Sequence, residues 1–146
     1  MADYPSDEQK IELTKEYFRR ADAGRPDLLD LFHEDALFYF PKFGVGHGRD
    51  SVPAMVAGFG AEIESIEHDF SDYLFIASGP NVAVEGTTRG QMNGKSWEAG
   101  KTPGGRFCNI FEFRGDRFSR VFVYLDPDYT GEDEARFRWG KEDRSW

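Results

Sequence analysis

Residues 106–129 read RFCNIFEFRGDRFSRVFVYLDPDY. Two runs rich in aromatic and β-branched residues, alternating with polar ones, flank the tetrad RGDR at 114–117. This pattern is typical of a β-hairpin with Gly115 and Asp116 in its turn. The second run stops abruptly at Asp126-Pro127-Asp128, so its strand is expected to deliver a carboxylate to one edge of a sheet.

The chain supplies helices first and strands later. Helices are expected from a capping box at 6–9 to Gly24, from Pro26 through Phe32, and from Asp50 or Ser51 to Phe59. Between the last two we expect a short strand over 36–40 and a mobile, glycine-rich loop over 42–49. Strands are expected near 65–77, 81–92, 95–112 and 118–125, with residues 101–105 forming a bulge or flap. This order predicts an α+β fold with the helices on one face of an antiparallel sheet.

Length and composition narrow the class of protein. The 146 residues fit one domain, with a core over about 7–129 and a charged tail over 130–146 that is expected to form an appended helix or arm. The net charge of −9, with scattered basic residues, argues against nucleic-acid and anionic-membrane partners. No apolar run approaches the roughly 20 residues of a membrane span, and the N-terminus lacks a signal-peptide pattern. We therefore expect a cytoplasmic protein.

Motifs for metals and cofactors are missing from the sequence. His33, His47 and His68 have no paired ligand spacing, and Cys108 is the single cysteine, so neither a metal site nor an internal disulfide is expected. The stretch GQMNGKS at 90–96 has three residues between its glycines, where a phosphate-binding loop needs four. No cofactor is expected.

The order of elements resembles the cone-shaped nuclear transport factor two-like superfamily, and within it the SnoaL-like group. The local likenesses are Tyr17-Phe18 followed by Ala23-Gly24, LFHEDA at 31–36, GRDSV at 48–52, VAVEG at 82–86 and VYLD at 123–126. They extend over residues 7 to about 129. The resemblance implies a curved mixed or antiparallel sheet wrapped around three N-terminal helices, a deep apolar pocket between them, and a homodimer formed through the sheet.

Two activities of the superfamily do not fit the residues of this chain. Ketosteroid isomerases use a Tyr and two Asp residues; Tyr17 matches the first, but Phe40 and Asn109 replace the acids. Limonene epoxide hydrolases use an Asp-Arg-Asp set, and Gly86, Thr88 and Val123 stand at those positions. Neither chemistry is expected.

SnoaL-like polyketide cyclases use a carboxylate as acid and base, and this requirement can be met. The resemblance favours a cofactor-independent cyclase, isomerase or lyase that transfers a proton on an apolar, carbonyl-containing molecule. The catalytic candidates are Asp126, His68 and Tyr17. The substrate-binding candidates are Asn109, Phe40, Trp97, Tyr124, Thr88 and Val123.

Several alternatives stay open at this point. Asp126 could simply end its strand and cap a turn, Tyr17 could be a packing residue, and His68 could be an edge histidine. Trp97 and Tyr124 could line either the pocket or a subunit interface. The chain could also be a non-catalytic ligand-binding or dimeric interaction module on the same scaffold.

Overall fold

The computed structural model describes residues 2–137, 139, 143, 145 and 146. In chain order the helices are α1 (Asp7–Asp22), the 3₁₀ helix η1 (Pro26–Leu31), α2 (Ser51–Gly60), and the 3₁₀ helices η2 (Phe70–Asp72) and η3 (Glu134–Phe137). The strands are β1 (Phe32–Phe40), β2 (Gly44–His47), β3 (Ile63–His68), β4 (Leu74–Ser78), β5 (Asn81–Met92), β6 (Lys95–Glu98), β7 (Arg106–Arg114) and β8 (Arg117–Leu125).

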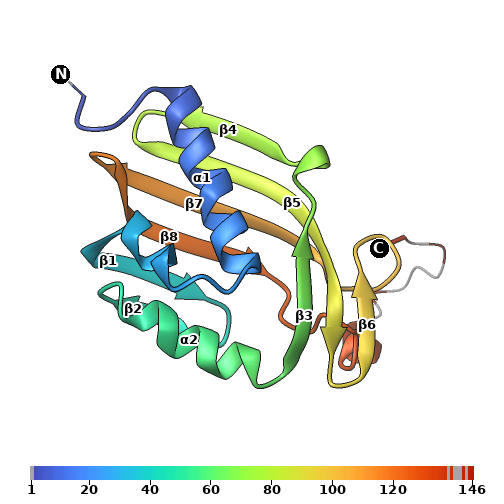
Figure 1. Cartoon of the computed structure of the whole chain (residues 1–146). Helices are drawn as coiled ribbons and strands as arrows, with labels where there is room; N and C mark the ends of the chain where they lie inside the picture. Colours follow the sequence, from blue (N-terminus) through green and yellow to red (C-terminus); the bar gives the residue numbers. More distant parts are fainter. Residues whose placement is uncertain (1, 138, 140–142, 144) are drawn as a thin grey trace.

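The strands form a curved, open, mixed sheet. Within the described residues its order is β2-β1-β8-β7-β5-β3, and β4 and β6 also pair with β5. Only the β1–β8 pair is parallel among these ladders. Figure 1 shows α1 lying across one face of the sheet and α2 near the ends of β1 and β3. The predicted α+β cone is confirmed.

Strand β5 joins two parts of the sheet. Residues 81–87 of β5 pair with β4 and β7, whereas its last residues, 88–92, pair with β3 and β6. The partners change between Thr87 and Thr88, close to Gly86. A Cβ atom at Gly86 would lie 2.6 Å from the Tyr73 ring and 2.8 Å from the Phe107 ring, so only glycine allows this close packing.

The core lies between α1 and the concave face of the sheet. Residues of β7 alternate between buried and partly exposed positions, with Phe107, Asn109, Phe111 and Phe113 on the buried side. The Phe18 ring on α1 packs against the Phe107 and Phe111 rings, with centroids 5.6 and 6.0 Å away. Burial of large aromatic rings is the main stabilising contribution that this arrangement makes.

The predicted hairpin and first helix are confirmed. Strands β7 and β8 pair from Phe107–Leu125 to Arg114–Arg117, and Gly115 takes a positive φ of 61° in the turn. At the start of α1 the Ser6 side chain accepts from the Gln9 amide, while the Gln9 side chain accepts from the Ser6 amide. These reciprocal bonds satisfy two of the free amides at the helix start.

Three local expectations were wrong. The second helix ends at Leu31, because Phe32 already belongs to β1 and pairs with Phe118 of β8. The stretch 42–49 is not a loop throughout: it contains β2, which pairs antiparallel with residues 37–40. The expected strand over 65–77 is broken into β3 and β4 by η2, whose Asp69 cap accepts from the Ser71 amide.

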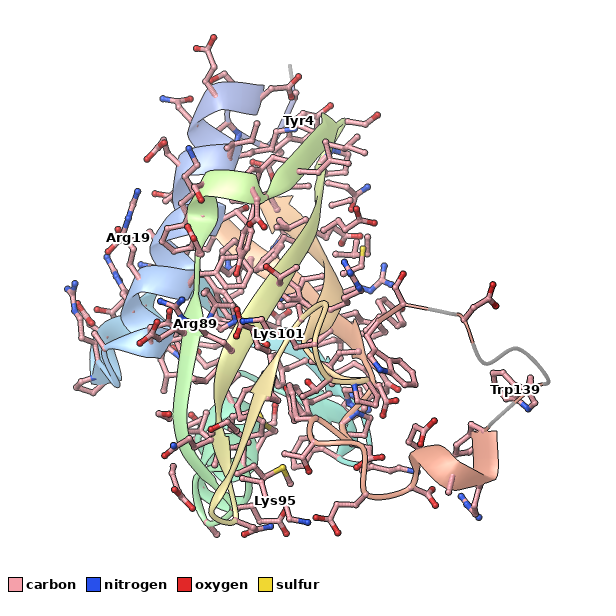
Figure 2. The ribbon with its side chains drawn as sticks, turned by 90° about the vertical axis from the view of Figure 1, so that its right-hand side faces the viewer. Tyr4, Arg19, Arg89, Lys95, Lys101 and Trp139 are labelled. Carbon is pink, nitrogen blue, oxygen red and sulfur yellow. The ribbon has the colours of Figure 1, made fainter. Side chains whose placement is uncertain are left out.

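The tail follows β8 as a turn and the short helix η3. The Phe137 ring contacts the Trp139 ring, with centroids 5.6 Å apart, and Figure 2 shows Trp139 away from the body of the molecule. The Arg106 side chain donates to the main-chain oxygen of Trp146 at 2.7 Å. Residues 138, 140–142 and 144 of the predicted arm lie outside the described residues. In the part of the chain that the structure describes, no helix is long and apolar enough to span a bilayer.

Candidate functional site

A cavity of about 750 Å³ lies between α1, α2 and the concave face of the sheet. Most of its wall is apolar, contributed by residues such as Phe18, Phe40, Val52, Phe59, Phe107 and Val123. Its volume falls in the range of small-molecule sites. The polar groups in the wall come from Tyr17, Asp22, His68, Thr88, Asn109 and Tyr129, with further charged residues such as Arg20 and Arg25.

His68 and Asp22 form a hydrogen-bonded pair in the cavity wall. Asp22 ends α1 and His68 ends β3, and the His68 Nδ1 atom lies 2.5 Å from Asp22 Oδ1. The main-chain N–H of His68 donates to the other carboxylate oxygen at 3.0 Å. The two side chains are 14% and 25% exposed, respectively. In the neutral tautomer that donates from Nδ1 to this carboxylate, Nε2 is left to accept a hydrogen bond.

The position of the His68 ring is fixed by aromatic neighbours as well as by Asp22. Its centroid lies 4.9 Å from that of Phe18 and 5.5 Å from that of Phe107. Packing on two rings and the Nδ1 hydrogen bond hold the imidazole in a single orientation, while the main-chain N–H of His68 bonds the same carboxylate. This is the arrangement that proton transfer by a histidine requires.

Asn109 is a polar side chain in the middle of the apolar wall. It is 3% exposed and lies in register with Val84 on β5 and Val123 on β8. Its Oδ1 atom is buried and accepts no hydrogen bond from the described residues. A buried carbonyl without a partner costs about 1–3 kcal/mol. An Asn side chain that only fills space at this position would therefore lower the stability of the fold.

Two tyrosine side chains line the same cavity. Tyr17 packs edge-on against Phe18 and Phe111, each with a centroid separation of 5.1 Å. Burial raises the pKa of Tyr17, and the nearby Asp22 carboxylate adds to this effect. Burial also raises the pKa of Tyr129, helped by Tyr17 and Asp126. Both phenols stay protonated at neutral pH and can donate a hydrogen bond to a bound molecule.

Trp97 lies behind two residues of the cavity wall, Thr88 and Tyr129. The Trp97 indole N–H donates to the Thr88 hydroxyl at 3.0 Å, and the Thr88 hydroxyl lies 3.4 Å from the Gly105 carbonyl oxygen. The Trp97 ring covers Gly90, where a Cβ atom would lie 2.5 Å from it. Trp97 thus supports the wall and does not line the cavity.

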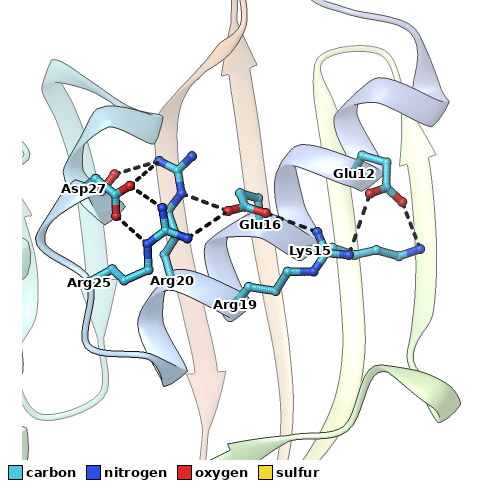
Figure 3. A network of polar contacts seen from close by, with 7 residues as sticks. All are labelled: Glu12, Lys15, Glu16, Arg19, Arg20, Arg25 and Asp27. Carbon is cyan, nitrogen blue, oxygen red and sulfur yellow. Dashed lines mark hydrogen bonds and ion pairs between the residues drawn. The ribbon is translucent and has the colours of Figure 1, made fainter.

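Charged residues near the mouth pair with one another. Figure 3 shows Arg20 and Arg25 between Glu16 and Asp27, in a network that continues through Arg19 to Glu12 and Lys15. The Arg20 guanidinium lowers the pKa of Glu16, and the Arg25 guanidinium lowers the pKa of Asp27. The network ties the end of α1 to η1 and pairs Arg20 and Arg25 with carboxylates.

Six of the residues singled out from the sequence come together in the cavity wall: Tyr17, Phe40, His68, Thr88, Asn109 and Val123. Their functional roles stay predictions. The other three do not line the cavity, for different physical reasons.

Asp126 does not reach the cavity. Strand β8 ends at Leu125, and Asp126 is exposed, with its carboxylate accepting from the Asp128 amide at 2.9 Å. This geometry is that of a residue that ends its strand and caps a turn. Tyr124 lies on the outer face, because strand alternation points its neighbour Val123 inward. Trp97 is buried behind Thr88, as described above.

Two polar residues of the wall, Asp22 and Tyr129, were not identified from the sequence. Asp22 follows Phe18 by four residues and therefore shares a helix face with it, which was an available signal. Its partner His68 is 46 residues away, so the pairing itself leaves no local pattern. Tyr129 follows the Asp-Pro-Asp turn, and no periodicity indicates that it folds back onto the cavity. Among the described residues, no group of three or more His, Cys, Asp and Glu side chains is placed to hold a metal ion.

Comparison with known families agrees with the fold. The family model of the SnoaL-like domain matches residues 14–121. The chain belongs to the SnoaL-like family. No curated protein matches this SnoaL-like chain.

Solved structures with the same fold are numerous. An NTF2-like protein from Anabaena variabilis is 21% identical, with a TM-score of 0.70, over 86% of this chain and 94% of its own. TerC, co-crystallised with polyporic acid, is 16% identical, with a TM-score of 0.68, over 81% and 92% of the two chains. A candidate polyketide cyclase from Xanthomonas campestris is 17% identical, with a TM-score of 0.67, over 83% and 93%. At these identities the likeness establishes the SnoaL-like fold alone.

Proposed function

We propose that this SnoaL-like protein is a cofactor-independent enzyme that transfers a proton next to the carbonyl group of a compact apolar molecule. The observation that carries the proposal is the 2.5 Å contact between His68 Nδ1 and Asp22 Oδ1 in the wall of an apolar cavity. In this proposal His68 is the acid and base, and Asp22 positions it.

The reaction begins with the ligand carbonyl hydrogen-bonded to the Tyr17 hydroxyl. His68 Nε2 takes the proton from the carbon beside the carbonyl, and the C–H electron pair moves toward oxygen to give an enolate. Tyr17 stabilises the negative oxygen by donating its hydrogen bond, and Asp22 stabilises the imidazolium. Return of the proton to the same or another carbon, or attack of the enolate on a second carbonyl, completes an exchange, an isomerisation or a cyclisation.

The residues at the catalytic positions of the related isomerases and hydrolases are not acids, and this supports a histidine as the acid and base. Phe40, Asn109, Thr88 and Val123 all line the cavity, and none of them is a carboxylate. Asp126 is exposed and caps a turn. Two further carboxylates line the cavity, but Glu64 accepts from the Gly94 amide and Glu67 pairs with Arg89. Asp22–His68 is therefore the histidine–carboxylate pair on which the proposal relies, and Asp126 has no part in it.

The test is proton exchange from a probe ketone. We expect the protein to accelerate the replacement of the α-protons of α-tetralone by deuterium in D₂O, followed by ¹H NMR, beyond an equal concentration of imidazole. His68→Gln should lower this acceleration at least about 100-fold, the typical contribution of a general acid or base. Asp126→Asn should leave it unchanged, since its carboxylate lies outside the cavity.

The outcomes separate the two candidate functions. Exchange in the protein no faster than in imidazole, despite binding of the ketone, would overturn the enzyme assignment and favour a non-catalytic binding module. Exchange that is lost in Asp126→Asn but kept in His68→Gln would return the acid–base role to Asp126.

We also propose that the outer face of the sheet pairs with a second copy of the chain, as the family resemblance implies. Cross-strand registers align an apolar row on this face: Ile76, Ala83, Ile110, Phe122 and Tyr39. Tyr124 extends the row and contacts Tyr39 at 5.6 Å between centroids. Light scattering after size exclusion should give a dimer for the native chain and a monomer for Ile76→Asp. Phe137→Asp, in η3, should stay dimeric.

A further inference from the structure

We infer that Asn109 and Tyr129 form a hydrogen-bonding subsite in the cavity that selects ligands carrying a hydroxyl group. The inference rests on the proposed function in taking the cavity as the ligand site, and it adds the chemical class of the ligand. It concerns binding, and it holds whether or not His68 transfers a proton.

The first support is the unpaired amide oxygen. Asn109 Oδ1 is buried and has no donor among the described residues, although its side chain lines the cavity. A terminal amide can turn over between two near-equivalent orientations, so it can present either its oxygen or its NH₂ group to the cavity. Satisfying the oxygen requires an O–H or N–H group, and no described residue donates one to it. A bound molecule with a donor removes this cost.

The second support is the rigid placement of Tyr129. Its ring lies against Trp97 with centroids 4.5 Å apart and contacts Phe59 at 6.2 Å. Its backbone lies against Gly104, where a Cβ atom would come within 2.4 Å of Tyr129 Cα. Because two rings and the close packing of its backbone hold Tyr129 in place, its hydroxyl has a defined position at the cavity.

The hydroxyl of Tyr129 makes no hydrogen bond with the described residues, and its side chain lines the cavity together with Asn109. Burial keeps this phenol protonated, so it offers a donor where Asn109 offers an acceptor. A ligand hydroxyl can donate its proton to Asn109 Oδ1, and a ligand oxygen can accept from Tyr129, because both side chains line the same cavity.

The charges around the cavity favour a neutral hydroxyl over an anion. Arg20 and Arg25 are paired with Glu16 and Asp27, and the Asp22 carboxylate is paired with His68. In these pairs each cation at the wall already has a carboxylate partner. None of them is therefore left to balance a ligand carboxylate or phosphate. The class of ligand is therefore a neutral, largely apolar hydroxy-ketone.

The binding test compares three ketones by ligand-observed NMR titration: α-tetralone, its 6-hydroxy derivative, and the methyl ether of that derivative. The native chain should bind the hydroxy compound about tenfold more tightly than the methyl ether, because only the hydroxyl supplies a donor to a buried acceptor. Asn109→Leu should reduce this ratio to about one by the same reasoning.

The tyrosine variant gives a different pattern. Tyr129→Phe keeps the ring on Trp97 and should weaken both oxygen-substituted ketones by about threefold to tenfold, without affecting unsubstituted α-tetralone. The matched control is Tyr124→Phe on the outer face, which should change none of the three affinities. Equal affinity of the native chain for all three ketones, or failure of all three to bind, would overturn the inference.

A second measurement needs no ligand. If Asn109 Oδ1 is unpaired in the free protein, Asn109→Leu should leave the thermal unfolding temperature unchanged or raise it, since a costly buried polar group is removed. A marked fall would show that the amide has a structural partner and would contradict the inference. Selective binding of the hydroxy compound without α-proton exchange would uphold this subsite while refuting the proposed enzyme.

Discussion

The indole ring of Trp97 lies against the ring of Tyr129, with centroids 4.5 Å apart and planes inclined by 39°. This contact joins the β6 edge of the sheet to the segment that follows β8. Trp97 is fully buried and does not line the cavity, but through this contact it supports Tyr129, which does. The stability of this contact can be measured separately from any ligand.

Replacing Trp97 by Phe should destabilise the protein by about 1–3 kcal/mol, from lost apolar contact and the lost hydrogen bond to Thr88. Urea unfolding followed by circular dichroism measures the difference. Trp139→Phe is the matched control and should have a negligible effect, because Trp139 is exposed. Equal effects of the two substitutions would contradict the supporting role of Trp97.

Replacing Asp22 by Ala should lower the free energy of unfolding by about 1–2 kcal/mol, because the His68 ring and main-chain N–H both lose their acceptor. The control is Glu67→Ala, which breaks an ion pair with Arg89 whose two side chains are each 65% exposed. Exposed pairs contribute little, so no measurable change is expected there. If Asp22→Ala lowers the free energy of unfolding no more than Glu67→Ala does, the Asp22–His68 pair does not hold α1 against β3.

The Glu16 network should make stability depend on pH in the acid range. The pKa of Glu16 is lowered by Arg20, so its stabilising contribution is fully present above the ordinary value of 4.5 and is lost as the pH falls through the lower folded value. The native chain should therefore be more stable than Glu16→Gln near neutral pH, and the two should converge in acid.

Urea midpoints of the two proteins across this range measure the convergence. Glu62→Gln is the control, because Glu62 forms no ion pair with the described residues, and its difference from the native chain should stay flat. A difference between the native chain and Glu16→Gln that is constant with pH would show that the carboxylate gains nothing from the arginines.

Two glycines should respond in opposite directions to alanine. Gly58 lies in α2 with nothing within 4 Å of an added Cβ, so Gly58→Ala should stabilise the protein by up to about 1 kcal/mol through helix propensity. Gly104→Ala would place its Cβ 2.4 Å from Tyr129 Cα and should destabilise by about 1–3 kcal/mol. Thermal unfolding of both variants tests this, and a harmless Gly104→Ala would show that the Tyr129 segment is not closely packed.

The α+β class and the β7–β8 hairpin could be predicted from the sequence because they depend on local pattern. Alternation over 106–125, with a turn at Gly115, specifies which side chains share a face whatever the partner strand is. The same alternation places Asn109 and Val123 on one face and Tyr124 on the other. The capping box at Ser6–Gln9 is likewise a contact between neighbours in the chain.

Other elements depended on partners far away in the chain. Phe32 became part of β1 because a parallel strand, β8, lies beside it, and residues 44–47 became a strand because β1 offered an edge. Strand pairing over long sequence separations overrides local propensity, since the hydrogen bonds of the ladder form only in the folded chain.

Local sequence pattern thus determined the fold class and the inward position of Asn109. Only the tertiary structure paired Asp22 with His68 across 46 residues, folded Tyr129 onto the cavity and left Asp126 in solvent. The physical reason is that secondary structure follows from the spacing of neighbouring residues. A site requires side chains from separate elements to converge, and their convergence is decided by how those elements pack.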